Sequence, residues 1–587
     1  MKNTKQLLNK RLYAFVCAAM AVCMILSACG GGGGGAPAAG DGESVAAATT
    51  TAVATTTAAA TTTAATTTAA TTAAAAEKPI EMTFLAMHSI YIEDFYTNKF
   101  TLWMEEQTGF HVNWESIPSQ GWEEKFALVL AGGDYPDVFY GLYISADKEV
   151  QYGAVENIII PLNDYLVDCP NINAAFDSNP LYRGAVTNYD GKIYAIPYIS
   201  DCAHCNASWK MWINTYFLDQ LGLDTPKTTD EFYDVLKAFR DNDPNGNGQA
   251  DEIPMATALD NWQGQMDTYL LNAFIPTSFG YRNPMTGIMR DGEKMVATFM
   301  QDDFKEGVRY VAKLFQEGLI MADSMSMNLD QLIPLAENES VPIVGAVPSG
   351  GSVCFSTMGS ERYRQFDAIA PLKGPKGLQA AATRITMPGS GIFAITKVCK
   401  HPELAIKFAD VSYSYEGTMR LRRGVPGVDW KDAEPGDIGI DGKPATWIEI
   451  TPWQQTDPQN QSFVQEFAYF EPASMRLGQK TDPDLDLYSE DGLSALLERF
   501  TSDLYEMYRR PEIVVPTLRL LPEEVSEFAT VITELESYIT TTVAQFYTGE
   551  LDIDGYWDTY INRLNELGIQ RLLERNEKAY ARQYLGK

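Results

Sequence analysis

The segment TTDEFYDVLKAFRDNDPNGNGQADE, residues 228–252, carries the clearest helix signal of the chain and the loop that follows it. Thr228 and Glu231 fit a capping box, in which two side chains satisfy the first backbone N–H groups of a helix. Four apolar residues then recur with the spacing of one helix face: Phe232, Val235, Leu236 and Phe239. The pattern predicts an amphipathic helix that ends near Arg240.

The loop after this helix has the residue pattern of a calcium site. Oxygen-bearing side chains stand at loop positions 1, 3, 5, 9 and 10, which are Asp243, Asn245, Asn247, Asp251 and Glu252. Gly248 stands at the turn, and Gln249 offers its backbone carbonyl. Hard cations such as Ca²⁺ take six to eight oxygens, so the pattern favours calcium. Pro254 replaces the glutamate that normally closes such a loop, and we expect Asp251 and Glu252 to close it together.

Two readings of this loop are open. A polar turn after a helix is often rich in Asn, Asp and Gly without binding a metal. The alternation of oxygen ligands favours calcium, and because all the ligands lie in one loop, the ion would have a structural role.

Outward from this segment, short apolar runs alternate with amphipathic helices. Residues 82–86 and 392–395 have the length and composition of buried strands. Strands that alternate with helices predict an α/β chain with largely parallel sheet. The chain from Pro79 to Lys587 suits two lobes of about 250 residues each.

The N-terminus has the pattern of an export signal. Basic residues precede an uncharged stretch at positions 12–28, which ends in small residues before Cys29. Leu26-Ser27-Ala28-Cys29 resembles the lipobox of bacterial lipoproteins, which implies that residues 1–28 are a signal peptide and that Cys29 carries the lipid. An uncleaved anchor helix is the alternative. Both place the chain on the outer face of the cell membrane.

Residues 29–78 contain little that could be buried. A glycine run is followed by an Ala/Thr tract, and such compositions do not pack into a core. The sequence predicts a disordered spacer between the lipidated cysteine and a binding domain at residues 79–587.

Charge and cysteine content exclude several classes of protein. There are 77 acidic against 45 basic residues, a formal net charge of −32, so we expect no nucleic-acid partner. Eight cysteines are too few for a disulfide scaffold. Cys202 and Cys205 form a CxxC with His204 inside it; a redox or zinc role is less favoured than an incidental or disulfide-forming pair.

Several motifs, taken in order, carry a family resemblance. They are WMEEQTG at 103–109, AGGDYPDV at 131–138, YDGKIYAIP at 189–197, LGLDTP at 221–226 with the loop after it, and GVPGVDW at 424–430. Together they resemble an extracellular solute-binding lipoprotein of an ABC importer, in the oligosaccharide-binding branch that includes the alginate-binding proteins.

The resemblance implies a type II periplasmic-binding-protein fold, with two α/β lobes and a hinge between them. The ligand would be an oligosaccharide held between the lobes, and the partners would be ABC permease subunits. We expect a monomer. The implied division is about 79–200 plus about 385–455 for lobe 1, and about 205–380 plus about 460–587 for lobe 2.

Aromatic and amide side chains are the candidates for contacting a sugar. Sugar rings present flat apolar faces rimmed by hydroxyl groups, so their sites combine aromatic rings with amides or carboxylates. Asn261 and Trp262 form the best local candidate, and the resemblance places Trp212, Trp430 and Trp447 near the cleft or in connecting loops. For each tryptophan, ordinary packing is the alternative.

The sequence favours a binding protein over an enzyme. No pair of carboxylates is singled out for glycoside hydrolysis, and the Gly389-Ser390-Gly391 segment lacks the spacing of a nucleophile elbow. The alternatives are a surface glycan hydrolase and a protein of the same fold that binds peptides or other solutes.

Overall fold

The computed structural model describes residues 80–278, 280–451, 458–464 and 467–587. The predicted signal peptide at residues 1–28, the lipidation residue Cys29 and the spacer at residues 29–78 lie outside the described residues. Within the described residues, no helix combines the length and apolar character needed to cross a bilayer.

The first lobe is built on a five-stranded sheet in the order β2-β1-β3-β11-β4. Its strands are β1 (Ile80–Met87), β2 (Phe110–Ile117), β3 (Val138–Ile144), β4 (Ile196–Pro197) and β11 (Gly391–Ile395). The buried strands predicted at residues 82–86 and 392–395 are therefore confirmed as β1 and β11.

Successive residues of β1 enter two different cores. Phe84 packs in a cluster with Phe408 of α13 (Pro402–Tyr413), at 5.2 Å between ring centroids. Its neighbour Leu85 belongs to the cluster that contains Phe126 of α3 (Trp122–Gly132). The side chains of a strand alternate between the two faces of a sheet, so one strand serves helices on both sides.

The expectation of a largely parallel sheet is only partly met. β1 is parallel to β2 and β3, whereas β11 is antiparallel to both of its neighbours. A crossover helix within one lobe makes neighbouring strands parallel. The chain reaches β11 from the second lobe instead, so that constraint does not apply.

The second lobe has a three-stranded antiparallel sheet in the order β10-β6-β9. Its strands are β6 (Lys210–Asn214), β9 (Ala346–Ser349) and β10 (Phe366–Ile369), and every residue of β6 is buried. The predicted capped helix is α9 (Thr229–Asp241), whose capping box between Thr228 and Glu231 is present. Its four apolar residues are buried in the core of this lobe.

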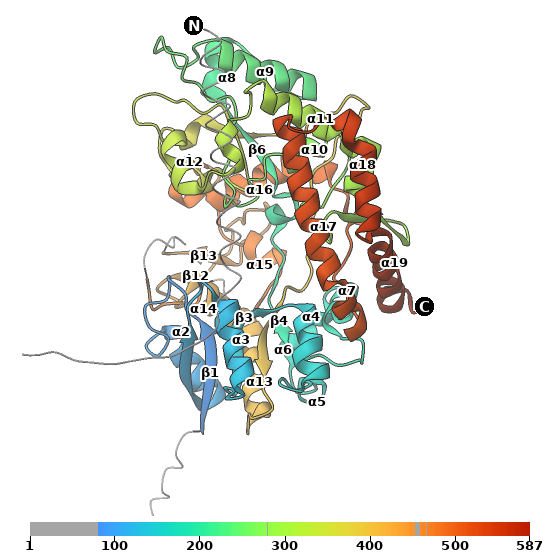
Figure 1. The fold of residues 1–587 in the computed structure, drawn as a ribbon. Helices are drawn as coiled ribbons and strands as arrows, with labels where there is room; N and C mark the ends of the chain where they lie inside the picture. Colours follow the sequence, from blue (N-terminus) through green and yellow to red (C-terminus); the bar gives the residue numbers. More distant parts are fainter. Residues whose placement is uncertain (1–79, 279, 452–457, 465–466) are drawn as a thin grey trace, which may run out of the picture. The chain divides into compact units, whose positions relative to one another are not determined.

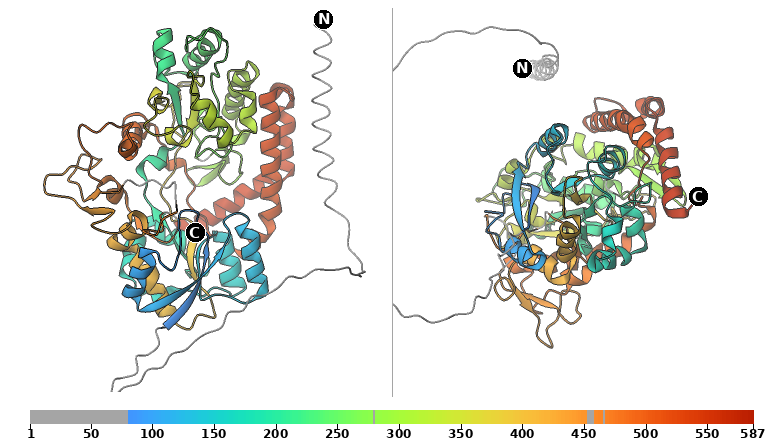
Figure 2. Two further views of the ribbon diagram at one scale, coloured as in Figure 1. Left: turned by 90° about the vertical axis from the view of Figure 1, so that its left-hand side faces the viewer. Right: turned by 90° about the horizontal axis from the view of Figure 1, so that it is seen from below.

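Long helices at the C-terminus complete the second core. α17 (Pro522–Thr548) packs beside α11 (Asp302–Gln316), and α18 (Ile553–Glu566) and α19 (Ile569–Tyr580) follow it. Figures 1 and 2 show these helices in red beside the green elements of the second core.

The remaining helices and strands are shorter. The helices are α2 (Lys99–Thr108), α4 (Ala146–Glu149), α5 (Asn163–Leu166), α6 (Pro170–Asp177), α7 (Pro180–Val186), α8 (Thr215–Leu221), α10 (Thr268–Leu271), α12 (Leu329–Ala336), α14 (Tyr415–Arg423), α15 (Ala473–Leu477) and α16 (Leu493–Leu504). The strands form the hairpins β7 (Ile288–Asp291) with β8 (Lys294–Ala297) and β12 (Trp430–Asp432) with β13 (Trp447–Glu449).

The chain crosses between the lobes through paired segments. β5 (Ile199–Ser200) leaves the first lobe and pairs with β14 (Phe470–Glu471). Phe463, Phe467 and Tyr469 pack in the first core. The lobe boundaries expected from the sequence instead put the chain after about residue 460 in the second lobe. The segment belongs to the first lobe because the rings of Phe463 and Phe467 pack against Phe95 and Trp114.

Candidate functional site

The predicted calcium loop is organised around its own side chains. The carboxylate of Asp243 accepts hydrogen bonds from the backbone N–H groups of Asn247 at 3.1 Å and Gly248 at 2.7 Å. The carboxylate of Asp251 accepts from the side-chain amides of Asn245 at 2.9 Å and Asn247 at 3.0 Å. Four of the six predicted ligand residues are thus brought together.

Glycine permits the turns of this loop. Gly246 and Gly248 have φ values of 72° and 75°, a region that L-residues with a Cβ rarely adopt. Gln249 is exposed, and its backbone N–H donates to Asn247 Oδ1 at 2.7 Å. The loop is attached to the second lobe by Ile253, whose backbone pairs with the chain just before β9.

Glu252 is the member of the loop that lacks a partner. Both of its carboxylate oxygens are buried without a hydrogen bond. Burial raises the pKa of Glu252, the charges of Asp251 and Asp243 raise it further, and the nearby backbone N–H groups of Asn245 and Glu252 lower it. A buried carboxylate without a partner is costly, so this residue fits a role as a cation ligand.

The loop carboxylates are not a tight cluster. Among the described residues, the set of three His, Cys, Asp or Glu side chains whose ligand atoms all lie within 4.8 Å of one another is Cys202, His204 and Cys205. The loop at residues 243–252 differs from such a cluster because it offers carboxylate, amide and backbone oxygens, which are the ligands that a hard cation prefers.

Asn261 holds the loop that presents Trp262. The Asn261 side chain is buried, donates to the carbonyl of Pro348 at 3.1 Å and accepts from the hydroxyl of Ser349 at 3.1 Å. The carbonyl of Trp262 accepts from the backbone N–H of Gly350 at 2.7 Å. The loop is therefore attached to the end of strand β9.

The indole of Trp262 is partly open to solvent. It remains 37% exposed, and its ring plane stands at right angles to the imidazole of His204, with 6.3 Å between ring centroids. A Cβ on Gly350 would lie 2.1 Å from an atom of the indole, so only glycine leaves room for the ring. The ring of Trp262 is thus held in place by its neighbours, while part of its surface stays open to solvent.

The three other predicted tryptophans are buried. Trp212 and Trp447 have no exposed surface, and Trp430 is nearly covered. Their indole N–H groups donate to backbone carbonyls within the protein, those of Ser349, Met475 and Gly424 respectively. The three rings serve packing, and of the four predicted tryptophans only Trp262 keeps a large exposed surface.

The loop that carries Trp262 also lines a cavity of about 340 Å³. Its wall includes Gly264, Gln265 and Arg282. Beneath it the fully buried Asp267 accepts hydrogen bonds from Tyr281 at 2.7 Å and Arg282 at 2.9 Å. Ligand pockets commonly measure about 300–1,000 Å³, so the volume of this cavity lies at the lower end of that range.

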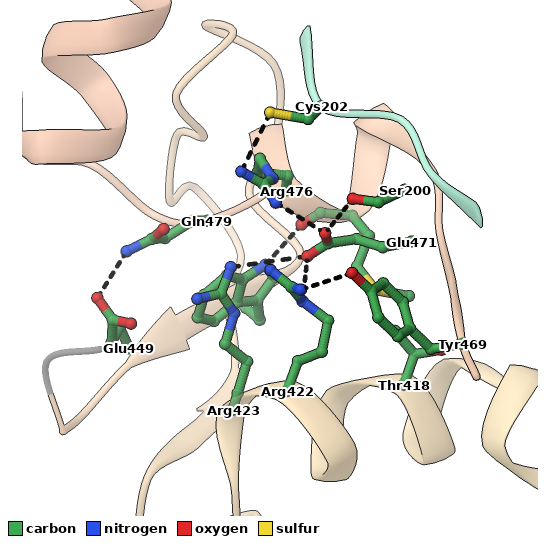
Figure 3. Close-up of polar contacts among 12 residues, drawn as sticks. Ser200, Cys202, Thr418, Arg422, Arg423, Glu449, Tyr469, Glu471, Arg476 and Gln479 are labelled. Atoms are coloured by element: carbon green, nitrogen blue, oxygen red, sulfur yellow. Dashed lines mark hydrogen bonds and ion pairs between the residues drawn. The ribbon is translucent and has the colours of Figure 1, made fainter. Parts of the chain in front are cut away.

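A second group of polar residues gathers around Glu471 at the crossing between the lobes (Figure 3). We call it the Glu471 cluster, and it consists of Glu471, Arg422, Arg423, Arg476, Ser200 and Tyr469. The carboxylate lies 3.1 Å from Arg422, 3.7 Å from Arg423 and 2.9 Å from Arg476. It also accepts from the hydroxyl of Ser200 at 3.0 Å.

The charges of this cluster fix the state of Glu471. Burial would raise its pKa, but the three arginines outweigh burial and hold the pKa well below its usual range. The cluster therefore joins β5, β14, α14 and α15 through one ionised carboxylate. The sequence did not predict this cluster, because its members lie far apart along the chain and no local pattern marks them. Ser200 and Glu471, for example, are 271 residues apart.

The CxxC pair is a disulfide in this structure. Cys202 and Cys205 are bonded, in agreement with the favoured prediction for the pair. Arg476 extends the Glu471 cluster to this disulfide, because its Nη1 donates to Cys202 Sγ at 3.4 Å (Figure 3).

Comparisons with known proteins agree on one family. The model of the family described as "Bacterial extracellular solute-binding protein" matches residues 88–419. The "Fructooligosaccharide ABC transporter substrate-binding protein FusA" of Streptococcus pneumoniae is 28% identical over 495 residues, which are 81% of this chain and 85% of FusA. The "Lipoprotein LipO" of Bacillus subtilis is 24% identical over 492 residues, 81% of this chain and 88% of LipO.

Solved structures show the same two-lobed fold. The S. pneumoniae FusA EF-hand mutant in complex with fructo-nystose aligns with a TM-score of 0.70 at 24% identity, covering 86% of this chain and 100% of that chain. The alginate-binding protein AlgQ2 without calcium ion aligns with a TM-score of 0.63 at 23% identity, covering 86% and 98%. Similarity at this identity concerns the fold.

Proposed function

The chain belongs to the bacterial extracellular solute-binding proteins, and we propose on that basis that it is the substrate-binding component of an ABC importer that captures an oligosaccharide between its two lobes. FusA, a relative over most of both chains, is described as a fructooligosaccharide-binding component of such a transporter. The type II fold suits this task, because closure of two lobes around a hinge removes water from the bound ligand.

The observation that carries this proposal is the setting of Trp262. Its indole is held by His204 and Gly350 and is still partly exposed. A fixed aromatic face costs little conformational entropy on binding and matches the apolar C–H face of a sugar ring. Asn261 would act indirectly, since its side chain is buried and its amide holds the loop.

We propose Ca²⁺ as the ion of the loop after α9. Asp243, Asn245, Asn247, Gln249, Asp251 and Glu252 would hold it, and the orphaned carboxylate of Glu252 supports this assignment. The bound ion would neutralise the loop carboxylates and fix the turn. Its role would be structural, and the relation to FusA is consistent with it because a FusA variant is described as an EF-hand mutant.

The proposed location is the outer face of the cell membrane, with the lipid on Cys29. One relative, LipO, is named a lipoprotein. The protein would act as a monomer that passes its sugar to permease subunits. A Cys29→Ser variant tests the anchor: wild-type protein should incorporate labelled fatty acid and the variant should not, whereas label retained in the variant would contradict lipidation at this residue.

Binding without turnover is the test of the main proposal. Titration of the protein lacking residues 1–78 with kestose, nystose and a panel of neutral and acidic oligosaccharides should give one-to-one binding to at least one of them. The recovered sugar should be intact. Release of shorter products would favour a glycan hydrolase, and binding confined to peptides would favour another solute class.

A further inference from the structure

The Cys202–Cys205 disulfide encloses His204 at the start of the second lobe. The two cysteines bracket the histidine in η2 (Ala203–Ala207), a 3-10 helix that follows β5. The disulfide closes this short turn, and the backbone N–H of Cys205 donates to the carbonyl of Cys202 at 2.9 Å. The imidazole lies against the sulfur of Cys202, 3.4 Å from Nε2. His204 and Cys202 are both buried, so the ring has little freedom.

The imidazole of His204 also contacts the indole of Trp262. The two rings are perpendicular, with 6.3 Å between centroids, which is the favoured edge-to-face geometry. The indole also packs on Gly350, where no Cβ could be accommodated. The ring of Trp262 is consequently oriented by two contacts, and one of them depends on His204.

The disulfide is tied in turn to the crossing between the lobes. Arg476 donates to Cys202 Sγ at 3.4 Å and to Glu471 at 2.9 Å (Figure 3). Contacts therefore run without a break from Glu471 in β14, through Arg476 and the disulfide, to His204 and Trp262.

We propose that His204 is a positioning residue for Trp262, and that the Cys202–Cys205 disulfide holds His204 in the orientation that the aromatic surface requires. This inference rests on the proposed function, since it assigns His204 to the site that contacts sugar. If the disulfide holds His204 in this way, ligand affinity depends on whether Cys202 and Cys205 are oxidised or reduced.

Reduction is the chemical means of releasing this arrangement. A dithiol donates two electrons and two protons, the S–S bond between Cys202 and Cys205 breaks, and the dithiol closes to a cyclic disulfide. Two thiols remain, and the turn around His204 loses its covalent closure. Loss of one edge-to-face contact corresponds to roughly a two- to tenfold loss of affinity.

The first experiment needs no sugar. The full chain is labelled with 5-fluorotryptophan, and the ¹⁹F resonance of Trp262 is assigned by its absence in Trp262→Phe. The resonance should shift or broaden in His204→Ala, in Cys202→Ala/Cys205→Ala and in wild-type protein treated with dithiothreitol. His204→Phe, which keeps an aromatic edge, should remain nearer to wild type. An unchanged resonance in the folded alanine variants would overturn the proposal.

The second experiment measures affinity for kestose by titration calorimetry. His204→Ala should bind roughly two- to tenfold more weakly than wild type, and His204→Phe should recover most of the loss. In a Trp262→Ala background, His204→Ala should have no further effect. An equal loss in both backgrounds would show a general structural effect and contradict positioning.

The two experiments separate the inference from the proposed function. If wild-type protein does not bind kestose, the sugar assignment has failed for that probe, and the ¹⁹F resonance alone decides the role of His204. If kestose binds and neither the resonance nor the affinity responds to His204→Ala, the sugar assignment stands and the positioning role is refuted. Thermal unfolding of each variant confirms that folded protein is compared.

Discussion

Nη1 of Arg519 lies 2.9 Å from Oε2 of Glu149, and both side chains are buried. Arg519 lies three residues before the start of α17 in the second lobe, whereas Glu149 ends α4 of the first. Arg519 also donates to the carbonyl of Ala185, and the side chain of Gln583 donates to the carbonyl of Gly184 at 2.8 Å. The C-terminal part of the chain is therefore anchored in the first lobe as well as in the second.

Breaking this ion pair on one side should be costly. Arg519→Met leaves the Glu149 carboxylate buried without its cation, and we expect the free energy of unfolding to fall by about 3–5 kcal/mol. The double variant Glu149→Gln/Arg519→Met removes both charges and should lose much less. Chemical denaturation measures both, and equal losses in the single and double variants would contradict the argument.

Glu471 should make the protein sensitive to acid. Its pKa is lowered in the folded state by Arg422, Arg476 and Arg423, so its stabilising effect is complete above the unfolded pKa of about 4.3. That effect is lost progressively as the pH falls below this value. The melting temperature should therefore depend less steeply on pH below about 4.5 in Glu471→Gln than in wild type.

The control for Glu471 is a surface pair of similar composition. Glu416 pairs with Arg420 in α14, and its side chain is 54% exposed. Such pairs contribute about 0–1 kcal/mol, so Glu416→Gln should follow the wild-type pH dependence. A Glu471→Gln profile that also follows wild type would show that the arginines do not lower the carboxyl pKa.

Lys210 should make stability depend on pH in a higher range, with the same sign as Glu471. It is fully buried in β6, and burial lowers its pKa to about 7, whereas an unfolded lysine titrates near about 10.4. Between these values the unfolded chain binds more protons, so stability should rise as the pH increases from about 7 to about 10. Lys210→Met should show a flatter dependence, and Lys237→Met on the exposed face of α9 serves as control. Parallel profiles for Lys210→Met and wild type would refute this.

Trp262 and Trp212 should separate binding from stability. Trp262→Ala removes a partly exposed ring and should weaken sugar binding by roughly 30-fold, the scale of an interface anchor, with little effect on unfolding. Trp212 is fully buried in β6, and Trp212→Ala should cost about 3–5 kcal/mol of stability. Calorimetric titration and denaturation measure the two effects. A loss of stability without a loss of affinity in Trp262→Ala would place that ring in the core instead.

Chelation should destabilise the protein through the loop after α9. An ion that binds only the folded chain adds about 2.7 kcal/mol at one hundred times its dissociation constant. EDTA should therefore lower the melting temperature, and added Ca²⁺ should restore it. Asp251→Asn should abolish this response, whereas Asp241→Asn, at the end of α9, should keep it. If EDTA does not change the melting temperature of the wild-type protein, the proposal that this loop binds calcium is wrong.

The start of α9 could be predicted because its determinants are local. Thr228 and Glu231 are three residues apart, and the helix geometry itself brings them together. The oxygen pattern of the next loop is local in the same way, so Asp243, Asn245, Asn247 and Asp251 were recognisable as a group. Partial antiparallel pairing was not predictable, because it depends on where the chain re-enters the first sheet at β11.

Residue type alone does not show which of the predicted tryptophans is exposed. Trp262 and Trp212 have the same side chain, yet one ring is partly exposed and the other is completely covered. The difference arises from packing: Trp212 meets Phe500 from a distant segment, while Trp262 lies at the tip of a loop.

Sequence alone determined the capped helix and the resemblance to solute-binding proteins, because each depends on residues that are neighbours along the chain. The export signal and the calcium loop depend on neighbouring residues in the same way, and they stay predictions. Tertiary structure decided that Glu471 meets Arg422 and Arg476, that Arg519 reaches Glu149, and that Trp262 is the ring left accessible beside His204. The physical reason is that burial and long-range charge pairing depend on which distant segments pack together. No local periodicity specifies that packing.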